Sequence, residues 1–326
     1  MKYRRLSKSD IEVSEISLGC WTMGGLNWIN GNPNGWADVN EGEVREAINY
    51  AIDNGVNHFD NADAYGNGRA ERMLARILGE RTNNFIIATK VGWFPGTAKH
   101  AYEPQHIRHQ CEQSLKNLNR NYIDLYYFHH GHFGDNDEYL DDAVEVMYRL
   151  REEGKIRLIG QSAYSHDDFS KLIPKVKPDA IQSFSSAIDD RFLQEGTPTR
   201  KLLQEKNISF VAFGPLAQGL LLDKYHKENP PNFDDGDHRK NSDRFSKENL
   251  TRLEPKMEQM KAKFGSSVED LARAALQYLL YYEVVGCVIP GFRNLKQVKS
   301  NIAAYDKPLT DDEFNFINDL FRDFKK

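Results

Sequence analysis

Four polar side chains stand where they can act together in chemistry. Asp60 closes the apolar segment VNHFD, Lys90 closes FIIATK, and His129 follows YIDLYYF. Tyr65 lies five residues after Asp60, in DNADAYG. Each has an ordinary structural interpretation, such as a loop cap, a solvated lysine or a histidine at a rim. Because parallel strands of a barrel end at one face, we expect the four side chains to meet there.

These residue types can exchange a proton with a reacting oxygen. A neighbouring ammonium favours the phenolate, so we expect Lys90 to lower the pKa of Tyr65 from its usual value of about 10. Asp60 would keep a buried Lys90 charged. His129 would hydrogen-bond to a carbonyl oxygen and orient it. Such a set protonates an alkoxide as it forms, which is what hydride delivery to a carbonyl requires.

The elements that must position these residues are predicted from the apolar pattern. Segments with helical spacing, such as 44–52, 107–118 and 143–150, alternate with short apolar segments. Eight of the latter, rich in β-branched and aromatic residues, are predicted strands: 15–21, 56–60, 85–90, 122–128, 156–160, 180–184, 208–213 and 284–290. Alternation indicates a parallel sheet, and continuous apolar strands indicate burial on both faces. The sequence therefore predicts an α/β fold, a (β/α)8 TIM barrel forming one domain over residues 1–326.

The competing architecture is a doubly wound open sheet. Its glycine fingerprint is missing after the first strand, where the chain reads Gly19-Cys20-Trp21-Thr22-Met23-Gly24. Two boundary signals support the helices. Pro104 stands where the first residue of a helix belongs, and 266–269 (SSVE) reads as a capping box.

Two stretches stand outside the repeat of strands and helices. Residues 27–38 (NWINGNPNGWAD) are rich in asparagine and glycine, and residues 224–246 are polar with turn residues but no helical period. Both are predicted to be long loops. Such loops are usually lids or binding walls, and a tolerated insertion is the alternative.

Composition limits the kinds of partner. The 326-residue chain carries a net charge of −5, which gives no reason to expect nucleic acid or an anionic membrane. Its apolar window 276–292 is interrupted by polar residues and glycine, so no membrane span is expected. Three widely spaced cysteines favour a reducing cytoplasm. The basic N-terminus lacks a following apolar stretch, so no secretory signal is expected and a small-molecule partner is favoured.

Several motifs together resemble one known family. In order and spacing, GVNHFDNADAYG, IIATK, YIDLYYFHH, GKIRLIGQSAYS, FVAFGPL and VIPGFRNLKQVKSNI are similar to the aldo-keto reductases. The resemblance extends from about Tyr3 to Ala304 and is greatest to the branch with bacterial stress-type reductases and potassium-channel β subunits. It implies a barrel whose floor is plugged by an N-terminal β-hairpin at about 3–16.

The resemblance also implies a chemistry. Asp60, Tyr65, Lys90 and His129 would form a catalytic tetrad, with Tyr65 as the proton donor. NADP(H) would bind along the rim without a Rossmann domain and transfer a hydride directly to the carbonyl carbon of an aldehyde, ketone or sugar. No metal is needed.

The cofactor contacts are carried over position by position. Ser162 and Gln182 would bind the nicotinamide carboxamide, and Phe213 would stack on the ring. The full set implied is Trp21, Ser162, Gln182, Phe213, Leu216, Gln218, Leu220, Gly291, Arg293, Gln297 and Asn301. Within it Leu216, Gln218 and Leu220 would lie along the pyrophosphate, and Gln297 and Asn301 near the adenosine.

The preference for NADP depends on the last loop of this set. A guanidinium forks onto phosphate oxygens, so Arg293 favours a 2′-phosphate. Gly291 and Gln297 stand where many members of the family carry basic residues, which weakens the preference over NAD. Ala163 replaces an asparagine that commonly contacts the carboxamide.

The substrate side is less defined. His130 and His132 are expected to line the substrate mouth. With His129 and Asp135 they form a cluster of metal-ligand residue types, but ligands from a second segment are lacking, so no metal site is predicted. Aromatic residues in the early loops, predicted to form a wall for a sugar, a terpenoid or an aromatic carbonyl, are Trp21, Trp28, Trp36, Trp93 and Phe94.

Two other functions stay open at this stage. The chain can be a nucleotide-binding regulatory or sensor subunit with little turnover, although an intact tetrad argues for catalysis. It can also be a lyase that uses Lys90 as a Schiff-base nucleophile, which would need an unpaired lysine. Reaction direction is open, and a homo-oligomer is possible.

Overall fold

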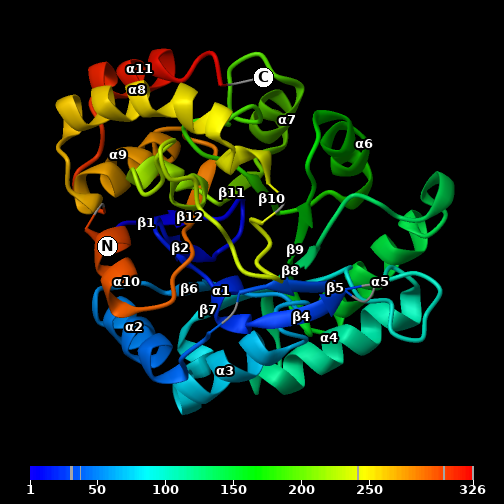
Figure 1. Ribbon diagram of the computed structural model, residues 1–326. Helices are drawn as coiled ribbons and strands as arrows, with labels where there is room; N and C mark the ends of the chain where they lie inside the picture. The colour runs from blue at the N-terminus through cyan, green and yellow to red at the C-terminus, as the bar shows by residue number, and fades with distance from the viewer. Residues whose placement is uncertain (30–31, 37, 241, 304, 325–326) are drawn as a thin grey trace.

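The computed structural model describes residues 1–29, 32–36, 38–240, 242–303 and 305–324. Of the residues in the predicted segments, 30, 31, 37, 241 and Ala304 lie outside this part. Within it, parallel strands pair in the order β12-β11-β10-β9-β8-β7-β6-β3 (Figure 1). They are β3 (Leu18–Gly19), β6 (His58–Asp60), β7 (Ile86–Val91), β8 (Ile123–Phe128), β9 (Ile156–Ser162), β10 (Ala180–Phe184), β11 (Ser209–Phe213) and β12 (Val285–Ile289). Each of the eight predicted strands is confirmed.

The barrel is nearly closed where its first and last strands meet. There the pairing is reduced to two isolated bridges, Ile16 with Val288 and Gly19 with Gly291. The amide of Ser17 donates to Val288 at 2.9 Å, and the amide of Val288 donates to Glu15 at 2.9 Å. These few bonds join the two ends of the sheet, which confirms the TIM-barrel prediction.

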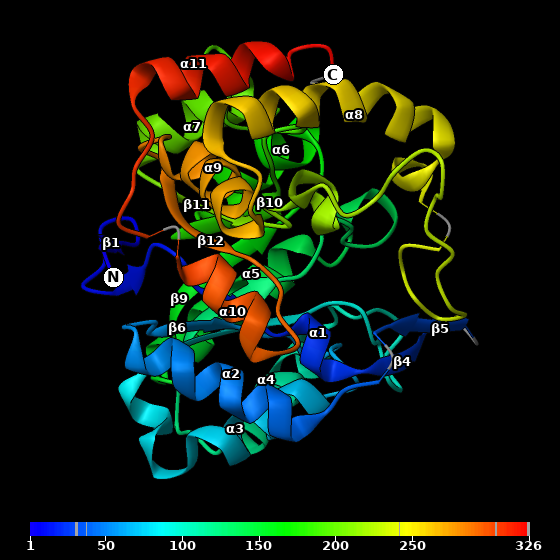
Figure 2. The same cartoon turned by 60° about the vertical axis from the view of Figure 1, so that its left-hand side comes forward.

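Helices surround the barrel and cover its outer face (Figure 2). They are α1 (Trp21–Gly24), α2 (Glu41–Asp53), α3 (Arg69–Leu78), α4 (Pro104–Leu118), α5 (Leu140–Glu152), α6 (His166–Val176), α7 (Pro198–Lys206), α8 (Lys247–Phe264), α9 (Val268–Leu280), α10 (Leu295–Ile302) and α11 (Asp311–Leu320). Short 3-10 turns are η1 (Gly79–Asn84), η2 (Asp135–Asp137), η3 (Ala217–Leu222) and η4 (Asp243–Phe245). No helix in the described ranges is both long and apolar enough to cross a membrane.

The helix boundaries follow local chemistry. Pro104 is the first residue of α4, as predicted. The capping box before α9 lies one residue later than the predicted 266–269: the side chain of Ser267 accepts from Asp270, and Asp270 reciprocates. Asp270 thus takes the place of the expected Glu269, and its carboxylate accepts from the backbone amide of Ser267.

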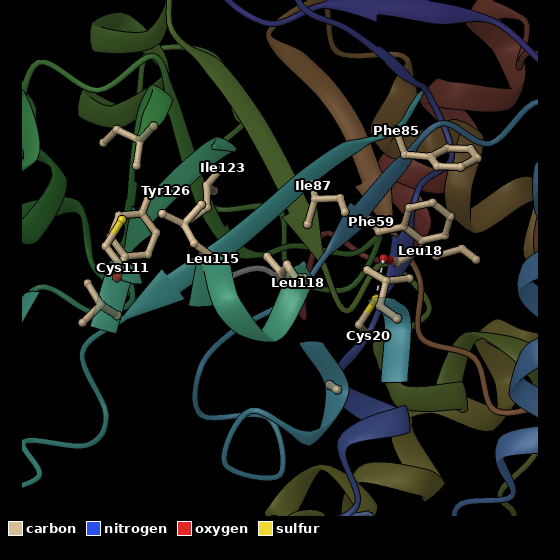
Figure 3. Close-up of a cluster of buried hydrophobic side chains, with 14 of the residues drawn as sticks. Leu18, Cys20, Phe59, Phe85, Ile87, Cys111, Leu115, Leu118, Ile123 and Tyr126 are labelled. Atoms are coloured by element: carbon tan, nitrogen blue, oxygen red, sulfur yellow. Dashed lines mark hydrogen bonds between the residues drawn. The ribbon is translucent and has the colours of Figure 1, made fainter. Parts of the chain in front are cut away.

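The core lies between the strands and the surrounding helices. Figure 3 shows Ile123 of β8 beside Leu115 of α4 and the free thiol of Cys111, and Phe59 of β6 beside Phe85, with Ile87 between the two groups. All are buried. The helical spacing of apolar residues in α2 and α4 therefore places one face of each helix on the barrel, as expected for amphipathic helices.

An N-terminal hairpin closes the floor of the barrel. Strands β1 (Tyr3–Arg5) and β2 (Glu12–Ser14) pair antiparallel. Leu6, Ile11 and Val13 pack in one buried cluster with side chains from the barrel interior, among them Leu125 and Val211. This confirms the predicted plug and leaves the opposite end of the barrel for the site.

The two predicted loops differ in structure. Residues 27–38 were expected to be irregular, but most of them form an antiparallel hairpin of β4 (Leu26–Ile29) and β5 (Asn32–Gly35). The segment 224–246 is a loop of turns, as predicted, with η4 near its end. The amide of Gly35 donates to Gly236 at 3.1 Å, and Figure 2 shows this loop, in yellow, reaching β5. Together they roof the carboxyl ends of the strands.

Candidate active site

A cavity of about 560 Å³ opens at the carboxyl ends of the strands, under this roof. Asp60 ends β6, Lys90 lies near the end of β7, and His129 directly follows β8. Tyr65 lies in the turn between β6 and α3. Asp60, Tyr65 and His129 line the cavity, so the predicted residues converge at one place.

Lys90 is the centre of this arrangement. Its Nζ is 2.5 Å from Oδ1 of Asp60 and 2.6 Å from the carbonyl oxygen of Asn61. It also donates to the hydroxyl of Tyr65 at 3.2 Å. The side chain is 0% exposed, so all three of its protons have acceptors in a water-free setting. The ammonium is therefore fully paired and rigidly held.

The pKa of Tyr65 shifts in the direction opposite to the prediction. Burial first, and the carboxylate of Asp60 next, raise the pKa of Tyr65 well above its usual value. The expectation that Lys90 lowers this pKa is wrong for the protein alone. The pKa is raised because Asp60 neutralises the ammonium of Lys90 and because the buried phenol has lost contact with water. Tyr65 is thus a protonated phenol at neutral pH, the form that a proton donor requires.

His129 is held as a neutral imidazole. Burial, followed by the charges of Lys90 and His130, keeps the pKa of His129 well below its usual value. Its ring lies 6.0 Å from that of Tyr65, edge to face, and 5.9 Å from the indole of Trp93. Nδ1 has no hydrogen-bond partner among the described residues. A neutral imidazole beside the phenol can hydrogen-bond to a substrate oxygen without adding charge.

Gln182 extends the network across the barrel. Its Nε2 donates to Oδ2 of Asp60 at 2.8 Å, so both carboxylate oxygens of Asp60 are engaged. Gln182 and Ser162 are buried and line the cavity from the ends of β10 and β9. The two residues assigned to a carboxamide therefore stand beside the tetrad.

Most of the other predicted cofactor contacts also reach the cavity. Those that line it are Trp21, Phe213, Leu216, Gln218, Gly291, Arg293, Gln297 and Asn301. Leu220 does not: its side chain is buried in the hydrophobic core, and Gly219 stands at the wall in its place. The side chain of Leu220 points away from the cavity because η3 bends at Gln218 and Gly219, both with positive φ, and turns the next leucine inward.

Sequence reasoning missed three basic residues at one end of the cavity. Lys224, Arg239 and Lys296 line it together with the predicted Arg293. Burial first, then the positive charges of Arg293, Lys296 and Arg239, lower the pKa of Lys224. Clustered cations repel one another, and an anion would relieve that repulsion. Lys224 and Arg239 belong to the 224–246 loop. The prediction of this loop as a lid or binding wall was the only feature of the sequence that pointed to them.

The aromatic wall is confirmed in part. Trp21, Trp36 and Trp93 line the cavity, whereas Phe94 does not and Trp28 is 66% exposed on the outer side of its hairpin. Sequence reasoning also missed His238, which lies 4.3 Å from Trp21 between ring centroids. Its Nε2 is 2.7 Å from Nε2 of Gln218.

Two histidines lie elsewhere than expected. His130 and His132 do not line this cavity but an adjoining depression. The ring of His130 is fixed between the carbonyl oxygen of Gly92, 2.7 Å from Nε2, and the amide of His132, 3.2 Å from Nδ1. These two bonds turn it away from the tetrad. Within the described ranges, no cluster of three or more His, Cys, Asp or Glu is arranged for a metal ion.

The geometry agrees with what comparison with known proteins shows. The model of the aldo/keto reductase family matches residues 15–322, so the chain belongs to this family. It is an oxidoreductase family whose members typically use NAD(P)H and small-molecule substrates.

Relatives and solved structures support the assignment. The chain is 30% identical to the uncharacterized oxidoreductase YqkF of Bacillus subtilis, over 96% of this chain and 94% of the relative. It is 27% identical to a probable voltage-gated potassium channel subunit beta of Arabidopsis thaliana, over 94% and 92% of the two chains. The structure of the glycerol dehydrogenase of Gluconobacter oxydans matches with a TM-score of 0.81 and 26% identity, over 99% and 95%. The predicted resemblance, channel subunits included, is confirmed.

Proposed function

We propose that this protein is an NADP(H)-dependent reductase that interconverts a carbonyl group and an alcohol, with Tyr65 as the general acid and base. One observation carries the proposal. Lys90, buried and held by Asp60, donates to the hydroxyl of Tyr65 inside the cavity. A hydrogen bond to the phenol oxygen stabilises the phenolate that remains after proton donation.

Each residue has a separate task in the reduction. When bound, NADPH supplies the hydride that the carbonyl carbon accepts. Tyr65 gives its proton to the carbonyl oxygen, so no free alkoxide accumulates. Lys90 stabilises the resulting phenolate, and Asp60 keeps Lys90 charged. His129, as a neutral imidazole, donates a hydrogen bond to the same oxygen and orients it.

The residues present fit such a cofactor. One end of the cavity offers the hydroxyl of Ser162, the amide of Gln182 and the aromatic face of Phe213. The other end gathers the basic side chains of Lys224, Arg239, Arg293 and Lys296. A ligand that is planar and uncharged at one end and phosphorylated at the other matches both. Arg239 is paired with Asp237 at 2.6 Å, so Lys224, Arg293 and Lys296 are the cations that favour the additional phosphate of NADP over NAD.

The substrate side supports an uncharged carbonyl compound. Near the tetrad the lining includes Trp21, Trp93 and Tyr164, and the ammonium of Lys90 there is already paired. Among the described residues this leaves no unpaired cation beside the tetrad to attract a carboxylate. The similarity to a glycerol dehydrogenase supports substrates that carry hydroxyl groups.

The alternatives are weaker on physical grounds. A Schiff-base lyase needs a lysine with a free lone pair, whereas Lys90 donates to three oxygen atoms. A regulatory subunit that only senses nucleotide is supported by the similarity to a channel β subunit. Such a subunit would have no use for a positioned proton donor.

The test measures nucleotide binding and turnover in the wild type and in a variant that lacks the hydroxyl group of Tyr65. We expect the purified protein to bind NADPH more tightly than NADH in a fluorescence titration and to reduce members of an aldehyde panel. Tyr65→Phe should keep the NADPH affinity within about twofold and lose at least a hundredfold in kcat, because only the proton donor is removed.

A matched control is Tyr126→Phe. Its hydroxyl is also buried, has no partner among the described residues and lies outside the cavity. This variant should retain activity. NADPH binding without turnover of any carbonyl would favour the sensor, and loss of NADPH binding in Tyr65→Phe would contradict the role assigned to the phenol.

A further inference from the structure

A second depression adjoins the cavity and has no task in the proposed reaction. We call it the distal dish, and it lies between the segments that follow β7, β8 and β9. Its residues are Trp93, His130, Gly131, His132, Gly134, Asn136, Asp137, Tyr164, Asp168 and Lys171. Two of them, Trp93 and Tyr164, also line the main cavity. The dish and the cavity therefore share a wall.

That wall is about one aromatic ring thick. The indole of Trp93 lies 5.9 Å from the ring of His129 on one side and 5.1 Å from the ring of His130 on the other. Trp93 is 41% exposed and Tyr164 is 48% exposed, although both are large aromatic residues. A ligand that reacts beside His129 can thus extend across Trp93 and reach the dish with its next unit.

The polar groups of the dish favour a neutral ligand. Lys171 is paired with Asp137, at 2.8 and 2.9 Å from its two oxygens. Asp168 accepts from the hydroxyl of Ser165 with Oδ2 at 2.7 Å and has no cation paired with it among the described residues. The balance of these charges is negative, which disfavours a phosphate or a carboxylate. His132 is exposed, so its ring is available as donor or acceptor.

The turn of η2 places a polar side chain in the dish. Asn136 and Asp137 adopt left-handed conformations in succession, with φ of 54° and 58°. Asparagine and aspartate are the non-glycine residues that most readily adopt this conformation. Asn136 is exposed and lines the dish, so its amide, both donor and acceptor, is available to a ligand there.

We propose that the distal dish is a subsite for a second, neutral, hydroxylated ring, so that the substrate is a two-unit saccharide or glycoside. Sugar rings place C–H faces on aromatic side chains and hydroxyl groups on amides, imidazoles and carboxylates. Trp93 and Tyr164 offer the aromatic faces, while His132, Asn136 and Asp168 offer the polar groups. This inference rests on the proposed function only for the reaction of the first unit at Tyr65. Binding of the second ring in the dish does not depend on it.

The experiment compares a two-unit substrate with a one-unit substrate. The kcat/KM of NADPH-dependent reduction is measured for maltose, glucose and glyceraldehyde in the wild type and in His132→Ala/Asn136→Gly. Glycine adopts the left-handed conformation of Asn136 without strain, so the turn is preserved. We expect kcat/KM for maltose to fall about tenfold, through KM, as for two lost hydrogen bonds. Glyceraldehyde should be unaffected.

A control variant makes the same chemical changes elsewhere. His109→Ala/Asn119→Gly removes an exposed imidazole from α4 and an amide from a left-handed position at its end, φ 53°, outside both depressions. It should leave the preference for maltose over glucose unchanged. Wild-type protein that reduces glyceraldehyde without preferring maltose to glucose would overturn the subsite, as would an unchanged preference in His132→Ala/Asn136→Gly.

Binding of a product analogue separates this inference from the proposed function. Saturation-transfer NMR with maltitol reports occupancy without turnover. If no aldehyde is reduced, the proposed function fails, and the dish is judged on maltitol alone. Binding that is lost in His132→Ala/Asn136→Gly and kept in the control supports the subsite, and absence of maltitol binding overturns it.

Discussion

Asp63 is a buried acid, two residues before the proton donor, that has no role in the proposed reaction. Neither of its carboxylate oxygens has a hydrogen-bond partner among the described residues. Burial first, and the nearby carboxylate of Glu71 next, raise the pKa of Asp63 well above its usual value. A buried carboxylate without a partner costs folding free energy whenever it is ionised.

Removal of this acid should therefore stabilise the protein at alkaline pH. The pKa is higher in the folded than in the unfolded state, so the stability contribution is present below about pH 4 and is lost as pH rises through the folded pKa. We expect Asp63→Asn to add about 1–3 kcal/mol to the free energy of unfolding at pH 8 and less at pH 5. Urea unfolding at both pH values measures this. The exposed Asp141→Asn is the control, and destabilisation at both pH values would contradict the prediction.

Arg293 is the residue at which cofactor preference can be measured. It lines the basic end of the cavity with Lys224 and Lys296. We expect Arg293→Ala to weaken NADPH binding about tenfold or more, as for a lost charged hydrogen bond, and to change NADH binding far less. Titration with both nucleotides checks it. Lys299→Met, on the same helix as Lys296 but outside the cavity, is the control, and equal losses for both nucleotides would exclude contact with a 2′-phosphate.

Residue types and their order were predictable, but their charge states were not. Asp60, Tyr65, Lys90 and His129 converge because each stands at or just after the end of a strand, and that position is local information. The raised pKa of Tyr65 depends on burial under a roof made by distant segments. The position of His130 depends on a bond to Gly92, which belongs to another loop. Neither is encoded in neighbouring residues.

At the scale of elements, the short helix α1 supports the loop of Tyr65. A Cβ added to Gly24 would lie 2.7 Å from the carbonyl carbon of Tyr65 and 3.0 Å from the nitrogen of Gly66. Both are backbone atoms, so they cannot rotate away as a side chain would. Gly24 thus allows two segments to approach closely enough to place the phenol.

Gly24→Ala should therefore impair catalysis without touching substrate. Displacement of the proton donor by about 1 Å is expected to lower kcat/KM about a hundredfold. Steady-state kinetics and an NADPH titration measure the two effects separately. Gly42→Ala, where the added Cβ would meet only the side chain of Asn40 at 3.2 Å, is the control. Full activity of Gly24→Ala would show that the loop can move aside.

The hairpin of β4 and β5 marks the limit of prediction for elements. The eight barrel strands are apolar and were predictable from local pattern. Asn27 to Gly35 is polar and contains Pro33, so no strand signal is present. Its pairing is supported by contact with another segment, since Gly35 binds Gly236 across the roof. A contact with a segment distant in the sequence therefore stabilises a hairpin that the local residue preferences disfavour.

At the scale of the whole molecule, Arg4 ties the N-terminal hairpin to the far end of the chain. Its guanidinium lies 2.7 Å from Oε1 of Glu15, 2.6 Å from the carbonyl oxygen of Leu280 and 2.9 Å from that of Val285. The side chain thus satisfies the end of α9 and the start of β12. The floor plug and the last strand are held by one cation.

We expect Arg4→Met to lower the free energy of unfolding by about 2–4 kcal/mol, because it leaves a carboxylate and carbonyl groups without a donor. Differential scanning calorimetry should show a lower Tm. The exposed Arg5→Met, whose only ion pair among the described residues is a distant one with Glu12 at 3.9 Å, is the control. Equal stability of the two variants would contradict the role of Arg4.

The thin seam between the first and last strands has a consequence for biosynthesis. Ile16 is synthesised long before its partner Val288, because the seven strands β6 to β12 and their helices lie between β3 and the end of the barrel. At cellular synthesis rates the interval is on the order of tens of seconds. During that time the nascent sheet has a free edge at β3, the kind of edge that aggregates or recruits chaperones. Translation of β12 therefore completes the barrel, and a ribosome stalled before β12 would display an open sheet to the quality-control machinery.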